Sequence, residues 1–398
     1  MKELPYKFIS VVTVFVVVVF IINNINHNFA MNDFKVYYYG AHALLHKQPL
    51  YDVLFTLGSG YYKYSPFTAL PFCILTVFTY YTACVIHFFI IGICIALTGL
   101  LIFRLLNTYV FHETIKSPNA ILLLSALCIV KHLVRELTVG NVNVIMLLLV
   151  SLCPYFMLKQ RNGMAALVLA LAIITKPFFI LLFIPLLIYK NYRVITQTVL
   201  MLLVLIFIPS IVVGFSHNIL LHKEWLNSVF VHAAGFVSPD MLNSIIQNWI
   251  YEDMPRSAQY AILLIFIGVF YFFWSDEYKS LQGDKKANDT AFILQWFIMV
   301  AAMPSLLATD TEHFLMTWPL IMFLLIYLFK NGGKVFTTLF VLSIVMYGGN
   351  LSDLIGKKLS SAISDTGVLG LSNLIIIAMV FYICFKQWVN RKAVKNEI

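Results

Sequence analysis

Runs of mostly apolar residues recur from one end of this chain to the other, and their length constrains the fold more than any other feature. A helix needs roughly 20 such residues to cross a bilayer, and somewhat fewer where the bilayer thins. Hydrophobic residues fill 61% of the 398 positions and charged residues only 11%. The pattern predicts an all-α polytopic integral membrane protein, forming a single membrane domain over residues 1–398.

The apolar runs predict about twelve membrane-spanning helices, several of them short. The first run resembles a signal sequence, but no small-residue cleavage site follows it, so we expect a retained anchor. The predicted spans lie near residues 8–24, 82–104, 118–131, 140–157, 163–175, 177–189, 194–214, 258–275, 289–308, 314–329, 335–350 and 367–386.

Charge along the chain predicts the orientation of these spans. Basic loops stay on the cytoplasmic side far more often than acidic loops. With both termini inside, most of the 27 Lys and Arg residues are cytoplasmic and most of the 18 acidic residues are outside. The net charge of +9 therefore follows from membrane topology and indicates no nucleic-acid partner. We expect a multi-pass protein of the plasma membrane, the inner membrane of a bacterium.

One apolar segment, residues 64–81, does not fit the alternation of the spans. Its two prolines and flanking tyrosines suit a re-entrant or interfacial helix. In the competing topology this segment crosses the membrane and residues 163–190 form one helix, which buries Lys176 in mid-bilayer at a cost of several kcal/mol. We therefore expect the first topology.

Familiar catalytic and metal-binding motifs do not occur in the sequence. The six cysteines lie in apolar segments without CxxC spacing, so neither a zinc site nor a disulfide framework is indicated. Walker, GxGxxG and HExxH motifs are also missing. We expect no redox cofactor, and a divalent cation is unsupported because the acidic residues near Asp33 show no ligand spacing.

Polar residues gather on the predicted outer face, in loops that are far apart in the sequence. Ionisable groups at span edges are costly unless paired, so their convergence indicates a polar cavity open to that side. The first loop is residues 25–81 and the fourth is residues 215–257. The outer loops supply Asp33, Tyr37 and Tyr64; Arg135, Glu136, Asn141 and Asn143; Lys176; Trp225, Asn243, Gln247 and Asn248; and Asp310, Glu312 and His313.

Each of these residues also has a purely structural explanation. Asp33 can cap the helix that follows it, and Lys176 can extend to the interface. His313 beside Glu312 can form a loop pair, and "GNVN" can be turn chemistry. The occurrence of all four features on one predicted face favours the functional interpretation.

The order of several segments resembles glycosyltransferase family 87. They are "NDFKVYYYGAHALLHKQPLYD", "YYKYSPFTALPF", "RELTVGNVNVIMLLLVSL", "KQRNG" with "LALAIITKPFFILLFIPLLIYKNYR", and "MPSLLATDTEHFLMTWPL". The resemblance covers about residues 30–330. It implies a C-class membrane fold similar to that of polyprenyl-phosphate-mannose-dependent mannosyltransferases.

The resemblance implies roles for individual residues. Asp33 matches the aspartate of the first outer loop that is the expected general base of an inverting transfer, and Asp52 is its rival. A departing lipid phosphate gains negative charge, which Lys176 and His313 are expected to stabilise because they match family positions. Arg135 is a further candidate for this role because it lies near them in the predicted topology. Substrate binding is expected from Tyr37, Tyr64, Asn143, Glu312 and Asn243.

The implied substrates are a polyprenyl-phosphate-linked sugar donor and a glycolipid or glycan acceptor, both met at the membrane. The chain departs from the family pattern at Asn141, where glutamine is usual, at "MLNSII", and at "TDTEH", which has one histidine where two often adjoin. Two other classes stay open: a lipid-linked glycan polymerase or ligase, and a secondary transporter.

Overall fold

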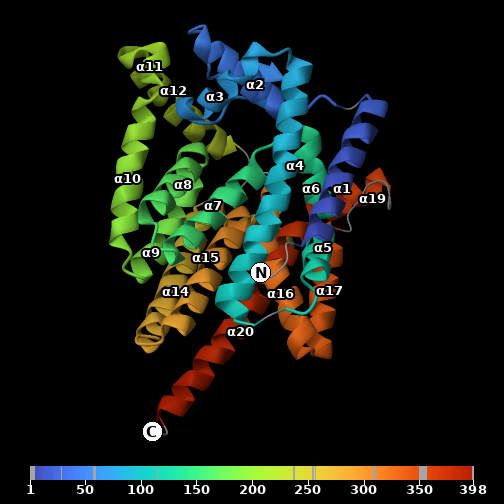
Figure 1. Cartoon of the computed structure of the whole chain (residues 1–398), viewed down its shortest axis with the longest axis vertical. Coiled ribbons are helices and arrows are strands. Elements are labelled where there is room, and N and C mark those ends of the chain that lie inside the picture. The colour runs from blue at the N-terminus through green and yellow to red at the C-terminus, as the bar shows by residue number, and fades with distance from the viewer. Residues whose placement is uncertain are drawn as a thin grey trace. The chain divides into compact units, whose positions relative to one another are not determined.

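The structure is a computed structural model that describes residues 5–27, 29–56, 60–113, 115–235, 238–252, 255, 257–307, 311–348 and 356–396. Helices dominate this part of the chain (Figure 1). The strands found within these ranges are β1 and β2, which pair antiparallel across Leu54 and Tyr61. The all-α fold class predicted from the sequence is confirmed.

The helices and strands follow one another closely along the chain. Their bounds are α1 Tyr6–Ile25, α2 Asn32–Leu45, β1 Leu54–Thr56, β2 Gly60–Tyr61, α3 Pro66–Cys73, η1 Leu75–Val77, α4 Tyr80–Leu105, η2 Leu106–Phe111, α5 Pro118–Cys128, α6 Val130–Val139, α7 Asn143–Leu158, α8 Asn162–Thr175, η3 Pro177–Leu182, α9 Phe183–Ile188, α10 Tyr192–Phe207, α11 Ser210–Val213, α12 Phe215–Gly235, α13 Leu242–Trp249, α14 Ala258–Ser280, α15 Lys285–Leu306, η4 Thr311–Thr317, α16 Trp318–Asn331, α17 Lys334–Gly348, α19 Lys357–Asp365 and α20 Val368–Asn396.

Seven helices in the described ranges are long and apolar enough to cross a membrane, and the bent pair α6–α7 makes up to eight. The protein is therefore a multi-pass membrane protein by the length and composition of its helices. The seven are Tyr6–Ile25, Tyr80–Phe111, Tyr192–Val213, Tyr260–Ser280, Lys285–Leu306, Thr311–Asn331 and Val368–Arg391.

The predicted number of twelve spans is not confirmed. The described residues of all twelve predicted segments are mainly helical, but four segments contain only short apolar helices: Pro118–Cys128, Asn162–Thr175, Pro177–Ile188 and Lys334–Gly348. At 1.5 Å per residue, a helix of this length is shorter than the hydrocarbon core of roughly 30 Å. The predicted non-spanning segment 64–81 contains α3, which has eight residues and is also too short to cross.

The chain divides into two compact units that alternate along the sequence. Unit 1 consists of Met1–Thr98, Leu133–Ile180 and Arg193–Phe236, and unit 2 of Gly99–His132, Leu181–Tyr192 and Val237–Ile398. The predicted single membrane domain, with its long outer loops at residues 25–81 and 215–257, stays a prediction.

In unit 1, helix α2 packs against α3, and α7 lies antiparallel to α8 (Figure 1). Helices α1 and α4 approach closely at Gly92, where a Cβ atom would lie 2.9 Å from Val16 Cγ1. Ala170, Ile174 and Leu205 form a buried apolar cluster in this unit. These contacts position the helix ends that carry the polar residues of unit 1.

In unit 2, helix α15 is the most enclosed span, with 89% of its apolar window buried. It packs against α16, η4 and α20. The Asn373 carboxamide on α20 donates to Ala301 O at 2.9 Å and to Ser305 Oγ at 2.8 Å, which ties α20 to α15. A buried amide with satisfied hydrogen bonds fixes the register of two apolar helices.

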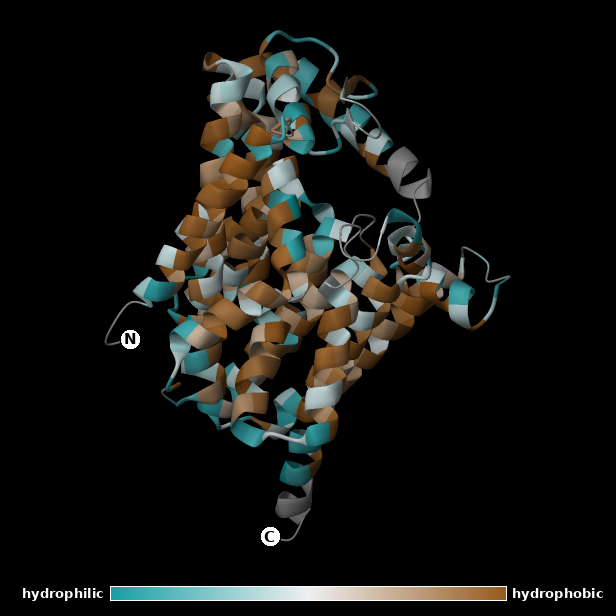
Figure 2. Ribbon diagram, turned by 90° about the vertical axis from the view of Figure 1, so that its right-hand side faces the viewer, coloured by the Kyte–Doolittle hydropathy of each residue, from teal (hydrophilic) through white to brown (hydrophobic). Residues whose placement is uncertain are grey.

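Other helices expose apolar side chains, as expected for surfaces that face lipid. Only 22% of the apolar window of the span Tyr192–Val213 is buried, and Leu200, Leu203 and Val204 are exposed on α10. Figure 2 shows hydrophobic colour along the length of the helices and hydrophilic colour mainly at helix ends and connections. This distribution is typical of a protein surrounded by a bilayer.

Candidate active site

A sharp bend between α6 and α7 organises the polar residues of unit 1. The two helices meet at 116°, and Gly140 in the bend has φ +74. A Cβ atom at Gly140 would lie 2.7 Å from Met31 Cε and 2.8 Å from Phe34 Cβ. Glycine is needed here for the backbone conformation and for the close approach, so the bend lies directly against the beginning of α2.

The Glu136 carboxylate on α6 reaches across the bend to the beginning of α7. Its Oε1 accepts the Val144 N–H at 2.8 Å and its Oε2 accepts the Asn143 side-chain amide at 3.1 Å. Glu136 and Asn143 are fully buried. A helix N-terminus has unpaired N–H groups and a partial positive charge, so a carboxylate at this place stabilises the bend.

Asp33 lies in the first turn of α2 and is half-buried. The Asn141 side chain donates from Nδ2 to Asp33 Oδ2 at 2.6 Å. Asn141 Oδ1 accepts the Val142 N–H at 2.7 Å, which fixes the amide with its nitrogen toward the carboxylate. The Tyr37 hydroxyl lies 3.4 Å from Asn141 Oδ1 and 3.0 Å from the Tyr64 hydroxyl. Asp33, Asn141, Tyr37 and Tyr64 are thus linked by side-chain hydrogen bonds.

Burial raises the pKa of Tyr37 well above its ordinary value, and the neighbouring Tyr64 and Asp33 raise it further. The Tyr37 hydroxyl therefore keeps its proton across the physiological range. It can act as a donor to Asn141 Oδ1, and it does not add negative charge next to Asp33.

Lys176 lies at the break between α8 and η3. A residue before proline is disfavoured in the α conformation, and Lys176 before Pro177 is extended, with φ −130 and ψ 97. Its Nζ donates to Asn143 Oδ1 at 2.5 Å, and the side chain is only 5% exposed. The fused helix over 163–190, the alternative rejected from the sequence, is not present.

Asp33 and Lys176 are therefore both bonded to side chains of the short segment 141–143, which leads out of the bend. We call the seven side chains of this network the Asp33 cluster: Asp33, Tyr37, Tyr64, Glu136, Asn141, Asn143 and Lys176. The cluster contains a carboxylate, which can accept a proton, and an ammonium group, which can stabilise an anion, and the two are bonded to side chains only two positions apart.

Two residues of the cluster, Glu136 and Asn141, received no role from the sequence. His87 on α4, which the sequence did not single out, lies next to the cluster and contacts the bend. Its Nε2 lies 3.0 Å from Gly140 O, and its ring stacks on Phe34 at 4.5 Å between centroids. The sequence did contain a feature that indicates the role of Glu136: an acidic residue that lies shortly before Gly140 and before the start of a new helix at Asn143.

Arg135 and Asp52 are exposed, whereas Lys176 is buried and Asp33 is half-buried. Arg135, predicted to bind the donor phosphate, is exposed on α6 one residue before Glu136. Asp52, the rival for the base, is exposed in a turn with φ 59. Neither side chain shares the buried surroundings of Asn143 and Lys176.

The remaining predicted site residues belong to unit 2. Glu312 and His313 lie in η4 and are 7% and 8% exposed. Asn243 lies in α13 and is also buried. Asp310, of the same predicted loop as His313, lies outside the described residues.

The segment before α13 is fastened to the beginning of α20. Asp240 Oδ1 accepts the Gly370 N–H at 3.1 Å, and burial raises the pKa of the Asp240 carboxyl. A Cβ atom at Gly370 would lie 1.9 Å from Asp240 O, so the close approach requires glycine. This contact fixes where Asn243 lies in unit 2.

Within the described ranges, no group of three or more His, Cys, Asp or Glu side chains is placed to hold a metal ion. The expectation that catalysis proceeds without a divalent cation stays a prediction.

The profile of glycosyltransferase family 87 matches residues 62–304, which is more than half of the chain. The match includes Tyr64, Arg135, Asn143, Lys176 and Asn243. Asp33, Tyr37, Glu312 and His313 lie outside the matched residues, so their roles rest on other arguments. No curated protein matches the chain. Together with the helical membrane fold, the profile match shows that this chain belongs to glycosyltransferase family 87.

Proposed function

We propose that this protein transfers a hexose, namely mannose, from a polyprenyl-phosphate-linked donor to a lipid or glycan acceptor on the extracytoplasmic face of the plasma membrane, with both termini in the cytoplasm. The observation that carries the proposal is the Asp33 cluster, in which a half-buried carboxylate and a buried lysine are bonded to one short segment. Membership of glycosyltransferase family 87 supports sugar transfer as the reaction class.

In the proposed reaction, Asp33 accepts the proton of an acceptor hydroxyl. The hydroxyl oxygen forms a bond to the anomeric carbon of the donor sugar while the bond from that carbon to the phosphate oxygen breaks. Attack from the side opposite the leaving group inverts the configuration. Asn141 holds the Asp33 carboxylate through a hydrogen bond to Oδ2, and a carboxylate fixed in this way can act as the general base.

The leaving group is a polyprenyl phosphate, which gains negative charge as the bond breaks. Lys176 is the buried cation of the cluster and stabilises that charge. Arg135 and His313 are the further cations proposed to meet the phosphate, and Tyr37, Tyr64, Asn143, Glu312 and Asn243 the residues proposed to bind substrate. The sugar arrives already activated, so no nucleotide, redox cofactor or nucleic acid takes part.

A lipid-linked glycan polymerase or ligase uses the same type of donor and is the second candidate. The secondary transporter has less support, because the family match favours a transferase. A requirement for divalent cations is tested by assaying transfer in EDTA, which we expect to leave the rate unchanged.

The testing experiment compares Asp33→Asn with wild type. Purified protein in detergent is given radiolabelled polyprenyl-phosphate-mannose and a membrane glycolipid extract, and labelled product is counted. Loss of a general base lowers rates by roughly 10²–10⁴-fold. The substitution keeps the shape of the side chain, so equal yields of folded protein are expected.

Asp52→Asn is the matched control, because Asp52 is an exposed aspartate of the same loop. We expect it to transfer at the wild-type rate. Wild-type activity in Asp33→Asn would remove Asp33 from the mechanism, and a loss in Asp52→Asn alone would assign the base to Asp52. No transfer by wild type from any of several polyprenyl-phosphate sugars would contradict the proposed donor.

A further inference from the structure

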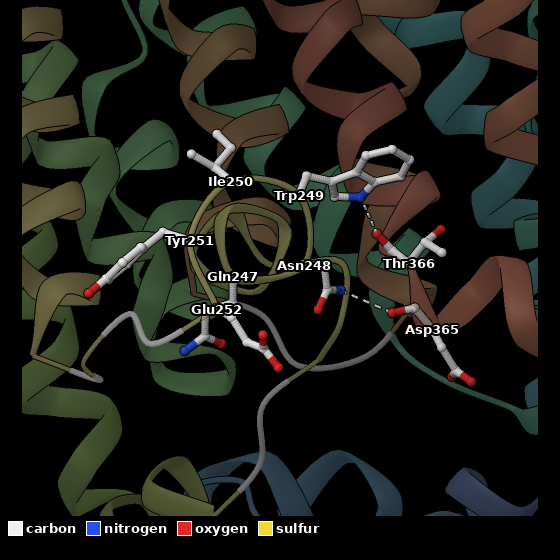
Figure 3. A pocket seen from close by; sticks show the side chains of 8 residues that line it. All are labelled: Gln247, Asn248, Trp249, Ile250, Tyr251, Glu252, Asp365 and Thr366. Carbon is white, nitrogen blue, oxygen red and sulfur yellow. Dashed lines mark hydrogen bonds between the residues drawn. The ribbon is translucent and has the colours of Figure 1, made fainter.

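A pocket of about 710 Å³ lies in unit 2, where the end of α13 meets the end of α19. Figure 3 shows the side chains that line it. Known small-molecule sites have volumes of roughly 300–1,000 Å³, so this space accommodates a ligand of the size of a short oligosaccharide. We call it the Trp249 pocket; its lining residues are Gln247, Asn248, Trp249, Ile250, Tyr251, Glu252, Asp365 and Thr366.

Backbone hydrogen bonds hold the shape of this pocket. The N–H groups of Ile250 and Tyr251 both donate to Ile246 O, at 2.8 and 2.9 Å, so the chain turns back at the end of α13. As a result Trp249 and Tyr251 point to opposite sides in the view of Figure 3, with Gln247 and Glu252 between them.

Two side-chain bonds join α13 to the end of α19. The Trp249 indole N–H donates to Thr366 O at 2.7 Å, and the Asn248 amide donates to Asp365 O at 3.0 Å. The indole is therefore fixed in orientation even though Trp249 is 59% exposed. An exposed aromatic ring that is held in place is a ready surface for a ligand.

The chemistry of the lining selects the class of ligand. Carboxylates of Glu252 and Asp365 and amides of Gln247 and Asn248 bind neighbouring hydroxyl groups, which donate and accept at once. The aromatic rings supply flat faces for the C–H side of a sugar ring. The two carboxylates of the lining, Glu252 and Asp365, repel an anionic ligand such as a phosphate ester.

The alternative explanation is that Trp249 and Tyr251 belong to an aromatic belt at the membrane surface. That explanation accounts for the rings near the beginning of the Tyr260–Ser280 span. It does not account for two carboxylates and two amides in the same pocket.

Residues 215–257 are a predicted outer loop. With the C-terminus in the cytoplasm, the connection between the last two predicted spans, residues 351–366, is predicted to be outer as well, and the Trp249 pocket is built from these two segments. We propose that the pocket binds the glycan part of the acceptor, as a neutral oligosaccharide. This inference rests on the proposed function, since it assigns the acceptor of that reaction a binding place outside the Asp33 cluster.

The test measures binding without donor, by saturation-transfer difference NMR on the full-length protein. The detergent must be a non-glycosidic one, because a sugar headgroup would compete. The probes are methyl trisaccharides of mannose, glucose, galactose and N-acetylglucosamine. We expect wild type and Asp33→Asn to give equal saturation transfer to at least one probe.

Trp249→Ala is expected to weaken that binding by roughly three- to ten-fold, as loss of one aromatic contact does. Glu252→Gln removes one exposed carboxylate with little risk to folding and is expected to weaken binding in the same direction. The matched control is Tyr260→Ala, which removes an exposed aromatic ring of α14 that does not line the pocket.

Equal binding by wild type, Trp249→Ala and Glu252→Gln would overturn the inference, as would no binding of any probe. The proposed function fails separately. If the protein binds a glycan probe but does not transfer mannose, the proposed donor is contradicted and the pocket is kept. If the protein transfers mannose but Trp249→Ala leaves the saturation transfer to the probe unchanged, only the pocket is contradicted.

Discussion

Carboxylates and amides occur together in the Asp33 cluster of unit 1 and in the Trp249 pocket of unit 2, but the two regions hold them differently. In the cluster, Glu136 and Asn143 are fully buried and bonded side chain to side chain. In the pocket, Asn248 and Trp249 are exposed and bonded to backbone carbonyls.

This difference has a physical consequence. Removing one partner from a buried network leaves another polar group unsatisfied, which costs about 1–3 kcal/mol, whereas water replaces a partner lost at the surface. The buried network suits chemistry that needs one fixed geometry. The exposed pocket suits recognition, where side chains can change without disturbing the fold.

After Asp33→Asn, the largest expected effect on transfer is that of Lys176→Met. Loss of a charge that stabilises the leaving group lowers the rate by roughly 10²–10³-fold. The measurement is single-turnover transfer at saturating donor. Lys358→Met, an exposed lysine of α19, is the control and is expected to keep the wild-type rate. If Lys176→Met folds and transfers normally, the cluster does not act on the leaving group.

Asn141→Leu and Asn248→Leu test the two regions against each other. Asn141→Leu removes the bond that holds Asp33, and misplacement of a catalytic group costs up to about 10²-fold in rate. We expect its kcat to fall with little change in acceptor KM. Asn248→Leu is expected to raise acceptor KM and keep kcat. The reverse pattern would show that the assignments of the two regions are exchanged.

Gly140→Ala is expected to destabilise the protein by about 1–3 kcal/mol, because the new Cβ meets α2 and the residue has positive φ. Gly163→Ala is the matched control, since no atom lies within 4 Å of a Cβ there. Thermal unfolding in detergent measures both. Equal midpoints would mean that the bend adapts more easily than its contacts indicate.

The smallest expected effect concerns Tyr37 and alkaline pH. Burial raises the pKa of Tyr37 in the folded state, so the unfolded chain loses this proton first. The stabilisation is therefore complete below the unfolded pKa of about 10 and is lost as pH rises above it. Tyr37→Phe should show a shallower fall of the unfolding midpoint between pH 9 and 11. If the unfolding midpoint falls equally with pH in wild type and Tyr37→Phe, water reaches the Tyr37 hydroxyl freely in the folded protein.

Much of the fold could be predicted from the sequence, because apolar length and proline are local signals. The break at Lys176 follows from Pro177, and α1 and α4 follow from long apolar runs. Several predicted spans were already short in the sequence, and hydropathy alone does not reveal where a helix begins or ends. Segments α5 and α17 are apolar but have only 11 and 15 residues.

The candidate site was predictable only in part. The sequence placed the loops of Asp33, Asn143 and Lys176 on one predicted face, but the pairing of Asn141 with Asp33 joins residues 108 positions apart. No local pattern encodes such a contact. Glu136 was missed for a related reason, since its role depends on the angle between two helices, which a linear sequence does not state.

The Glu136 carboxylate at the beginning of α7 also determines which groups of the substrate-free protein are available to bind an anion. Helix N-termini commonly serve as ready anion sites, but here the chain's own carboxylate already occupies that place. The bend is therefore preorganised before any substrate arrives. The lipid phosphate of the proposed donor would meet a filled helix terminus, so side-chain cations rather than the helix dipole would recognise it.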